Sequence, residues 1–187
     1  MSTPASATTP QVPVPAGTWN VDPVHSSVEF HVKHLGIATV KGVFKEFEGS
    51  LQVGPDGAKA TGSVQVASVD TREEQRDAHL RSPDFFDAEQ FPQITFTSTS
   101  ITPTGGDDFE IVGDFTIHGV TRSLTLTASL EGAETDPQGN QRVGLSANGQ
   151  INRGDYGMKF NMALGSGNVV VSDKVKILLE VSAVKAA

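Results

Sequence analysis

Strict two-residue alternation is the feature of this sequence that most constrains its fold. In residues 123–130, leucine or alanine occupies every second position and serine or threonine the positions between. Because successive side chains of a β-strand point to opposite faces, this pattern indicates a strand with one buried and one solvated face. The same period places Val28, Phe30 and Val32 on one face of residues 27–34. The chain is therefore expected to be all-β apart from one interval.

Turn signals divide the alternating sequence into eight expected strands. Asp136-Pro137-Gln138-Gly139-Asn140 is one such signal, in which proline presets φ and glycine accepts a positive φ. Eight strands joined mostly by hairpins favour a single antiparallel, lipocalin-like barrel, whose interior can hold one small ligand, although a two-sheet sandwich stays open. Gly42 and Gly49 interrupt the second strand as candidate bulges or corners. The expected strands cover residues 27–34, 39–53, 62–69, 93–101, 109–117, 122–130, 142–151 and 174–184.

A short helical segment is expected near residues 72–90, where the alternation stops. Thr71 and Glu74 fit a capping box, with Thr71 as the N-cap of a helix that ends at about Arg81. Phe85 and Phe86 follow shortly after the helix. We expect this segment to bury both rings across one end of the barrel.

Composition narrows the classes of function. The chain has 22 acidic and 14 basic residues, for a net charge of −8, which argues against nucleic acid or an anionic membrane surface as the main partner. It has no cysteine, which excludes disulfides and thiolate chemistry. No stretch approaches the ~20 apolar residues of a membrane-spanning helix, so no integral membrane segment is expected.

The first 16 residues differ in composition from the rest of the chain. They are rich in proline and alanine and contain neither lysine nor arginine. A secretory signal needs a basic start and an apolar run, and neither is present. We interpret residues 1–16 as a disordered, Pro-rich leader, residues 17–187 as one domain, and the location as cytoplasmic.

The histidines do not predict a metal site. His25, His31, His34, His79 and His118 are spread over separate elements and lack the spacing of metal ligands. No Gly-x-Ser-x-Gly motif indicates a hydrolase. The sequence therefore predicts no cofactor and no metal.

The segment around Arg153 carries the most distinctive polar side chains. Arg153, Asp155 and Tyr156 stand among glycines, which allow a sharp bend. With His25 they form the expected polar rim of an apolar barrel. Two interpretations of Arg153 stay open: it binds the head group of a ligand, or it fixes the bend through Asp155 or the backbone.

A series of blocks in the chain resembles the YceI-like family of polyisoprenoid-binding proteins over about residues 17–184. The resemblance implies a lipocalin-like barrel with an elongated pore, which binds a long isoprenoid without transforming it. Many members of that family carry a secretory signal and act in the periplasm. The blocks are Trp19-Asn20-Val21-Asp22-Pro23-Val24-His25-Ser26, Phe30, His34-Leu35-Gly36, Gly42-Val43-Phe44, Arg76-Asp77-Ala78-His79-Leu80, Phe85-Phe86-Asp87, Phe91-Pro92, Gly113, His118-Gly119-Val120-Thr121, Asn152-Arg153-Gly154-Asp155-Tyr156-Gly157 and Val171-Ser172-Asp173-Lys174-Val175.

The resemblance and the strand pattern together predict a non-enzymatic lipid carrier or store. Its ligand would be a long-chain isoprenoid, such as a polyprenyl phosphate or an isoprenoid quinone, or a similar amphiphile; a homodimer is compatible with this prediction. The head group would lie at the rim of His25, Arg153, Asp155 and Tyr156. The predicted apolar lining consists of Phe30, Val32, Phe44, Phe86, Phe96, Phe115, Ile117, Leu126, Leu145, Ile177 and Leu179.

Two other functions stay open at this point. An enzyme acting on such a lipid would need Arg153, Asp155, His25 and His79 to converge in one cleft. A structural or stress-related module with an incidental ligand would have a completely filled barrel.

Overall fold

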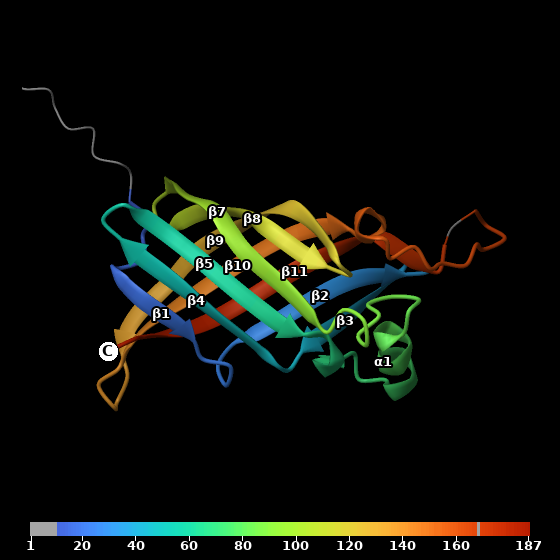
Figure 1. Ribbon diagram of the computed structural model, residues 1–187, viewed down its shortest axis with the longest axis horizontal. Helices are drawn as coiled ribbons and strands as arrows, with labels where there is room; N and C mark the ends of the chain where they lie inside the picture. Colours follow the sequence, from blue (N-terminus) through green and yellow to red (C-terminus); the bar gives the residue numbers. More distant parts are fainter. Residues whose placement is uncertain (1–10, 168) are drawn as a thin grey trace, which may run out of the picture.

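One antiparallel sheet closes on itself to form an elongated barrel (Figure 1). The computed structural model of the chain describes residues 11–167 and 169–187. The strands follow the order β1-β4-β5-β7-β8-β9-β10-β11, and β11 pairs with β1, which confirms the predicted eight-stranded barrel. The strands are β1 (Gly17–Val21), β2 (Ser27–His34), β3 (Ala38–Phe44), β4 (Phe47–Gly54), β5 (Gly57–Gln65), β6 (Val69–Asp70), β7 (Gln93–Gly105), β8 (Asp108–Ile117), β9 (Val120–Thr135), β10 (Gln141–Asn152) and β11 (Val171–Lys185).

Each of the eight strand positions around the barrel is called a stave here, and three of the staves are built from two short strands. Strand β11 pairs with β1 through Val21 and with β2 through Ser27, so β1 and β2 act as two halves of one stave. Strands β3 and β4 form the next stave, and β5 and β6 the third, since β6 pairs with β3. The single strand expected over residues 39–53 is therefore broken. The N–H groups of Lys45 and Glu46 leave the strand ladder and bond to Ser68.

Of the two alternatives for Gly42 and Gly49, the prediction of β-bulges is wrong. Gly42 pairs with Phe30 and Gly49 pairs with Gly62, and neither pairing shifts register. Both glycines lie on the inward face of their strands, where the absence of a side chain leaves room for a neighbour.

The predicted helical segment covers the end of the barrel that lies at the right in Figure 1. Helix α1 spans Glu74–Arg81, and its N-cap is Glu73, whose carboxylate accepts hydrogen bonds from the backbone N–H groups of residues 75 and 76. The prediction of Thr71 as the N-cap is wrong. The Thr71 hydroxyl instead donates a hydrogen bond to the buried Asp77 carboxylate at 2.5 Å. Phe85 and Phe86 follow in hydrogen-bonded turns and are buried, as predicted.

The other end of the barrel is covered by the chain that precedes β1. Residues 1–10 of the predicted leader lie outside the described residues. In the described remainder, Val14 is 3% exposed, and the Pro15 carbonyl accepts a hydrogen bond from Trp19 Nε1 at 2.8 Å. This part of the predicted leader therefore packs on the barrel.

The alternation predicted from the sequence is clear in β8. Phe109, Ile111, Phe115 and Ile117 point inward with the buried Gly113 and are each no more than 9% exposed, while the alternate residues of the strand face outward. The inward rows of all staves meet in one core. None of the helices in residues 11–167 and 169–187 has the length and apolarity that a membrane crossing requires.

Candidate functional site

An apolar cavity of about 290 Å³ lies inside the barrel. Every stave contributes to its wall, which extends from Trp19 and Leu51 to Phe86 beneath the α1 segment. All eleven residues of the predicted apolar lining lie in this wall. Their contact with a ligand stays a prediction.

The cavity wall also includes large side chains that the predicted lining omitted. Trp19 and Phe109 are 2% and 1% exposed, respectively, and both line the cavity. The strand period could have found them, since Trp19 is in phase with Val21 and Phe109 with Ile111. Met158 lies in a segment without alternation, where the sequence gives no signal.

Aromatic rings lie over glycines on the inner wall. A Cβ atom on Gly42 would overlap the Phe30 ring, and one on Gly113 would stand 2.5 Å from Phe96 Cζ. Each ring thus covers the backbone of the neighbouring strand rather than extending toward the barrel axis. These glycines help to keep the lumen open.

Arg153 places a buried cation in the cavity wall. It opens the 3-10 helix η2 (Arg153–Tyr156), which follows β10; the Asn152 side chain accepts a hydrogen bond from Gly154 N, and Gly157 ends the turn with a φ of 78°. Arg153 is only 3% exposed. Burial lowers its pKa, and the nearby Asp173 carboxylate opposes that shift.

Three backbone carbonyls hold the Arg153 guanidinium. Nε donates to Ser172 O at 2.9 Å, Nη1 to Met158 O at 2.8 Å and Nη2 to Val171 O at 3.2 Å. The exposed Asp173 carboxylate lies 3.7 Å from Nη2. These carbonyls join η2 to the start of β11, so the Arg–backbone bridge considered from the sequence is present. It does not exclude a ligand role, because Arg153 also lines the cavity.

The neighbours of Arg153 in η2 lie outside the cavity wall. Asp155 is exposed, and its carbonyl accepts a hydrogen bond from Arg122 Nε at 2.8 Å. Tyr156 is 3% exposed, and its ring packs against Phe115, with 5.7 Å between the ring centroids. Burial raises the pKa of the Tyr156 hydroxyl. The structure therefore brings only Arg153 of this trio to the lumen.

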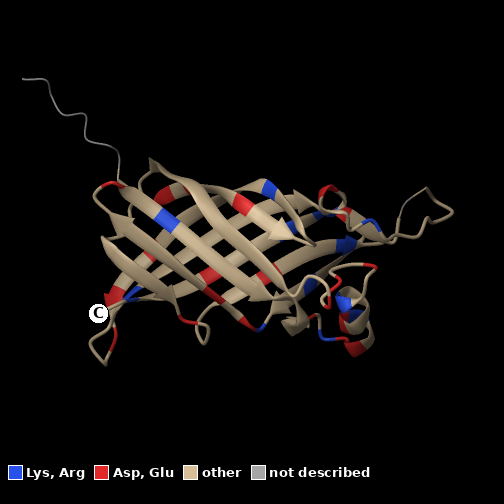
Figure 2. Cartoon of the chain, in the orientation of Figure 1, with Lys and Arg blue, Asp and Glu red and all other residues tan. Residues whose placement is uncertain are grey.

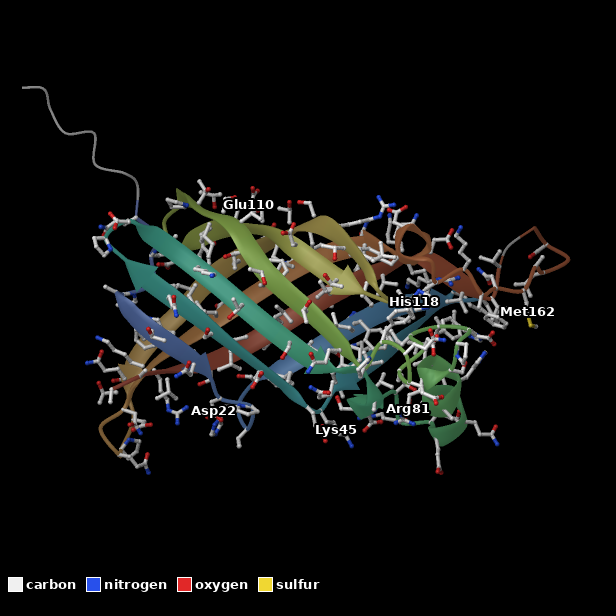
Figure 3. All side chains as sticks on the ribbon, viewed as in Figure 1. Asp22, Lys45, Arg81, Glu110, His118 and Met162 are labelled. Atoms are coloured by element: carbon white, nitrogen blue, oxygen red, sulfur yellow. The ribbon has the colours of Figure 1, made fainter. Side chains whose placement is uncertain are left out.

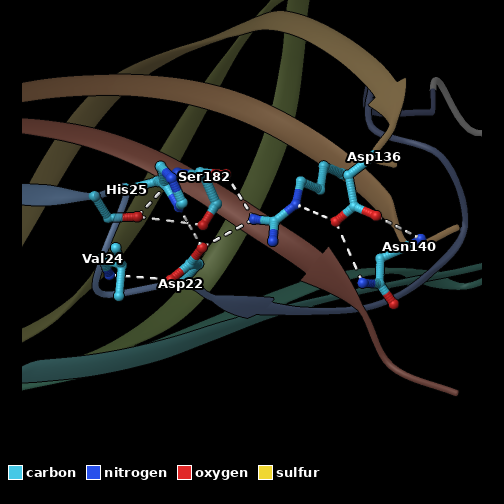
Figure 4. Close-up of polar contacts among 8 residues, drawn as sticks. Asp22, Val24, His25, Asp136, Asn140 and Ser182 are labelled. Atoms are coloured by element: carbon cyan, nitrogen blue, oxygen red, sulfur yellow. Dashed lines mark hydrogen bonds and ion pairs between the residues drawn. The ribbon is translucent and has the colours of Figure 1, made fainter. Parts of the chain in front are cut away.

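His25 belongs to a separate polar network on the outside of the wall (Figure 4). Its Nδ1 lies 2.7 Å from Asp22 Oδ2, which also accepts a hydrogen bond from Arg142 Nη1 at 2.9 Å. Arg142 Nε donates to Asp136 Oδ2 at 2.7 Å. Hydrogen bonds from His25 and then Arg142 lower the pKa of Asp22 to about 2, and the bond from Arg142 chiefly lowers the pKa of Asp136 to about 2. This network ties the β1–β2 junction to β10 and its hairpin.

The polar residues considered for catalysis do not converge. His79 lies on the α1 segment, bonds to Asp84 at 2.9 Å and packs between the rings of Phe85 and Phe160. Of His25, His79, Asp155 and Arg153, only Arg153 lines the cavity. In the part of the chain that the structure describes, no three His, Asp or Glu side chains are placed to hold a metal ion.

The YceI-like domain model matches residues 19–183. The chain belongs to the YceI-like family. This confirms the resemblance seen in the sequence blocks.

Relatives of this YceI-like chain share both its sequence and its fold. Protein YceI of Escherichia coli is 40% identical over 148 residues, which cover 78% of this chain and 77% of that protein. The crystal structure of a Campylobacter jejuni YceI protein is 30% identical and has a TM-score of 0.70, covering 83% of this chain and 90% of that one. A polyisoprenoid binding domain from Saccharophagus degradans covers 90% of this chain and 98% of its own, with a TM-score of 0.68; at 14% identity it shows the fold alone.

Proposed function

We propose that this chain binds a long-chain isoprenoid lipid in the barrel cavity and carries or stores it without transforming it. The observation that supports this most is the cavity itself, whose wall has apolar side chains from every stave and includes one buried cation. The name of the Saccharophagus degradans domain, which shares the fold, also supports a polyisoprenoid as the ligand class. Each CH₂ group that the tail buries would contribute ~0.8 kcal/mol.

The size of the cavity limits how much of the tail it holds without rearrangement. Its 290 Å³ is about twice the ~150 Å³ of an apolar cavity that binds benzene. A long tail would therefore need side chains to move. The rings of Phe30, Phe44 and Phe86 lie within 6.2 Å of one another, centroid to centroid, and Phe86 belongs to the α1 segment. We infer that a shift of this segment withdraws Phe86 and admits the tail.

Arg153 is the proposed partner of an anionic head group. A guanidinium has five N–H donors, and three of them bond to backbone carbonyls within the described residues. The remaining N–H groups, one on Nη1 and one on Nη2, are then available to ligand oxygens, with the exposed Asp173 carboxylate 3.7 Å from Nη2 as their competitor. Charge-assisted bonds to a phosphate are among the strongest hydrogen bonds in proteins, so we expect polyprenyl phosphates to bind more tightly than polyprenols.

The absence of catalysis is part of the proposal. It is supported by the separation of His25, His79 and Asp155 from the cavity wall. The cytoplasmic location and the homodimer stay predictions, which cell fractionation and analytical ultracentrifugation would test.

Native mass spectrometry with added polyprenyl phosphate, polyprenol and isoprenoid quinone tests the proposal. We expect a complex of one lipid per chain. Ala147→Phe places a ring in the lumen and should abolish the complex, whereas the adjacent Asn148→Phe, on the outward face, should retain it. A wild-type chain that binds none of these lipids, or an Ala147→Phe variant that binds them equally well, would contradict the proposal.

A further inference from the structure

An uncharged hairpin projects beyond the barrel, next to the end covered by α1 (Figure 2). No charged residue occurs between positions 160 and 172. Ala163 and Val169 form a bridge across the hairpin, and Met162 and Val169 are 58% and 40% exposed. Figure 3 shows Met162 pointing away from the barrel at this end.

The turn between β2 and β3 adds a third apolar side chain beside the hairpin. Leu35 N donates to Val170 O at 2.9 Å, and Val170 N donates to Met162 O at 3.0 Å, so the two loops are held together. Ile37 in this turn is 82% exposed. We call Ile37, Met162 and Val169 the apolar tip. They are three of the four exposed large apolar residues in the described part of the chain.

The base of the hairpin is part of the cavity wall. Asn161 bonds to both the N–H and the carbonyl of Val171, at 3.1 and 2.7 Å. Val171 lines the cavity, and its carbonyl also accepts a hydrogen bond from Arg153 Nη2. The apolar tip therefore projects from the end of the cavity that holds the guanidinium.

Exposed lysines flank the apolar tip. Lys33 lies close before the β2–β3 turn, while Lys159 and Lys174 lie on either side of the hairpin; Asp173 is the acidic residue in the same stretch. The net charge of −8 provides no long-range attraction to an anionic surface. Local lysines act only within about a Debye length, ~8 Å at physiological salt, so they would matter only after apolar contact is made.

We propose that the apolar tip inserts into the interfacial layer of a lipid bilayer, so that the Arg153 end of the cavity faces the membrane during lipid exchange. This inference rests on the proposed lipid-carrier function. Exposed apolar side chains beside basic ones are typical of surfaces that enter the head-group region. Three side chains on two loops cannot supply the ~800 Å² per partner of a standard protein interface, which favours a bilayer over a second copy of the chain.

Flotation with vesicles of phosphatidylcholine and phosphatidylglycerol in equal amounts tests the proposal. We expect the wild-type chain to bind and Ile37→Asp/Met162→Asp to lose roughly tenfold to hundredfold in affinity for each residue, since burial of such a side chain contributes about 1.5–3 kcal/mol. Val24→Asp is the matched control, because Val24 is 83% exposed but lies in the β1–β2 junction. It should bind as the wild type does.

The contribution of the lysines to vesicle binding is tested by comparing vesicles with and without an anionic lipid. Lys33→Gln/Lys159→Gln should lose about fivefold per residue on these vesicles, from ~1 kcal/mol for each lysine near an anionic surface, and nothing on pure phosphatidylcholine. Lys59→Gln, on the hairpin strand β5 at the other end of the barrel, should bind unchanged.

A fluorescence measurement reports insertion without an acidic substitution. The only tryptophan of the chain, Trp19, is buried, so the wild-type emission serves as the background and the difference between an Ile37→Trp variant and the wild type reports the tip. We expect a blue shift on addition of vesicles. No shift would overturn the proposal, even if the double Asp variant failed to fold.

Uptake of polyprenyl phosphate from detergent, measured on the same variants, separates this inference from the proposed function. Isoprenoid binding without vesicle binding would overturn the tip proposal and leave the carrier function standing. Vesicle binding through the tip without isoprenoid binding would support the tip and contradict the carrier function. A double Asp variant that converts a dimer to a monomer with unchanged vesicle affinity would overturn the proposal and identify the tip as an interface between copies.

Discussion

Replacement of Arg153 by glutamine separates the structural and ligand-binding contributions of its guanidinium. The substitution removes three hydrogen bonds to the carbonyls of residues 158, 171 and 172. At ~1 kcal/mol net for each bond, the free energy of unfolding should fall by about 3 kcal/mol, partly offset because a buried cation no longer has to be desolvated. Urea unfolding, followed by circular dichroism, measures this change.

The same variant should lose its preference for a phosphorylated ligand. One lost charge-assisted hydrogen bond corresponds to about 1.5–3 kcal/mol, or roughly tenfold to hundredfold in affinity, for polyprenyl phosphate but not for polyprenol. Arg153→Lys keeps the charge without the planar fork, so it should lose stability but retain part of the preference.

Arg122→Gln is the matched control for Arg153→Gln. Arg122 also donates a hydrogen bond to a backbone carbonyl of η2, that of Asp155, but it lies outside the cavity wall. It should lose little stability and keep the ligand preference. If the free energy of unfolding of Arg153→Gln lies within about 0.5 kcal/mol of the wild-type value, the bonds to the backbone carbonyls do not stabilise the fold. If the ratio of the affinities for polyprenyl phosphate and polyprenol is unchanged, the head-group role of Arg153 is refuted.

Three further predictions concern the barrel. Trp19→Ala should lower the free energy of unfolding by about 3–5 kcal/mol, because the ring is almost fully buried; a loss below about 1 kcal/mol in urea unfolding would show that this end is loosely packed. Gly42→Ala should lower it by about 1–3 kcal/mol and weaken isoprenoid binding, since the new methyl group pushes the Phe30 ring into the lumen; unchanged binding in native mass spectrometry would contradict this. Asp22 and Asp136 have pKa values of about 2 against 3.8 normally, so their stabilisation is present above pH ~4 and is lost as the pH falls toward 2; acid unfolding of Asp22→Asn should show a weaker dependence on pH in that window, and an identical profile would rule out this contribution.

The inward face of the strands could be predicted from the sequence because a strand has a period of two. The ten strand residues of the predicted apolar lining lie in the cavity wall, since the phase of one strand residue fixes the direction of its neighbours; the eleventh, Phe86, reaches the wall from the α1 segment. Alternation cannot show where a stave is broken. Lys45 and Glu46 leave the ladder because Ser68, more than twenty residues later, offers them acceptors.

The polar residues could not be placed because their partners are distant in the sequence. His25 was expected at the rim, yet it bonds to the nearby Asp22, whose carboxylate is fixed by Arg142, 120 residues later in the sequence. Tyr156 lies in a 3-10 helix, where the period of two no longer gives a direction, and its ring packs on Phe115 instead of facing the lumen. The glycines in the strands were recognisable from the sequence. Without knowledge of the neighbouring strand, however, a glycine in a β-bulge cannot be distinguished from a glycine that lies under an aromatic ring.

The pairing of β11 with both β1 and β2 has a consequence for folding. The barrel closes when β11 pairs with its first two strands, so the fifteen residues of β11 complete the wall. Until β11 pairs, β10 on one side and β1 and β2 on the other have no common neighbour, and the lumen is open along its length. A lipid can therefore be enclosed only after β11 has paired. Until then, two unpaired strand edges are available for aggregation.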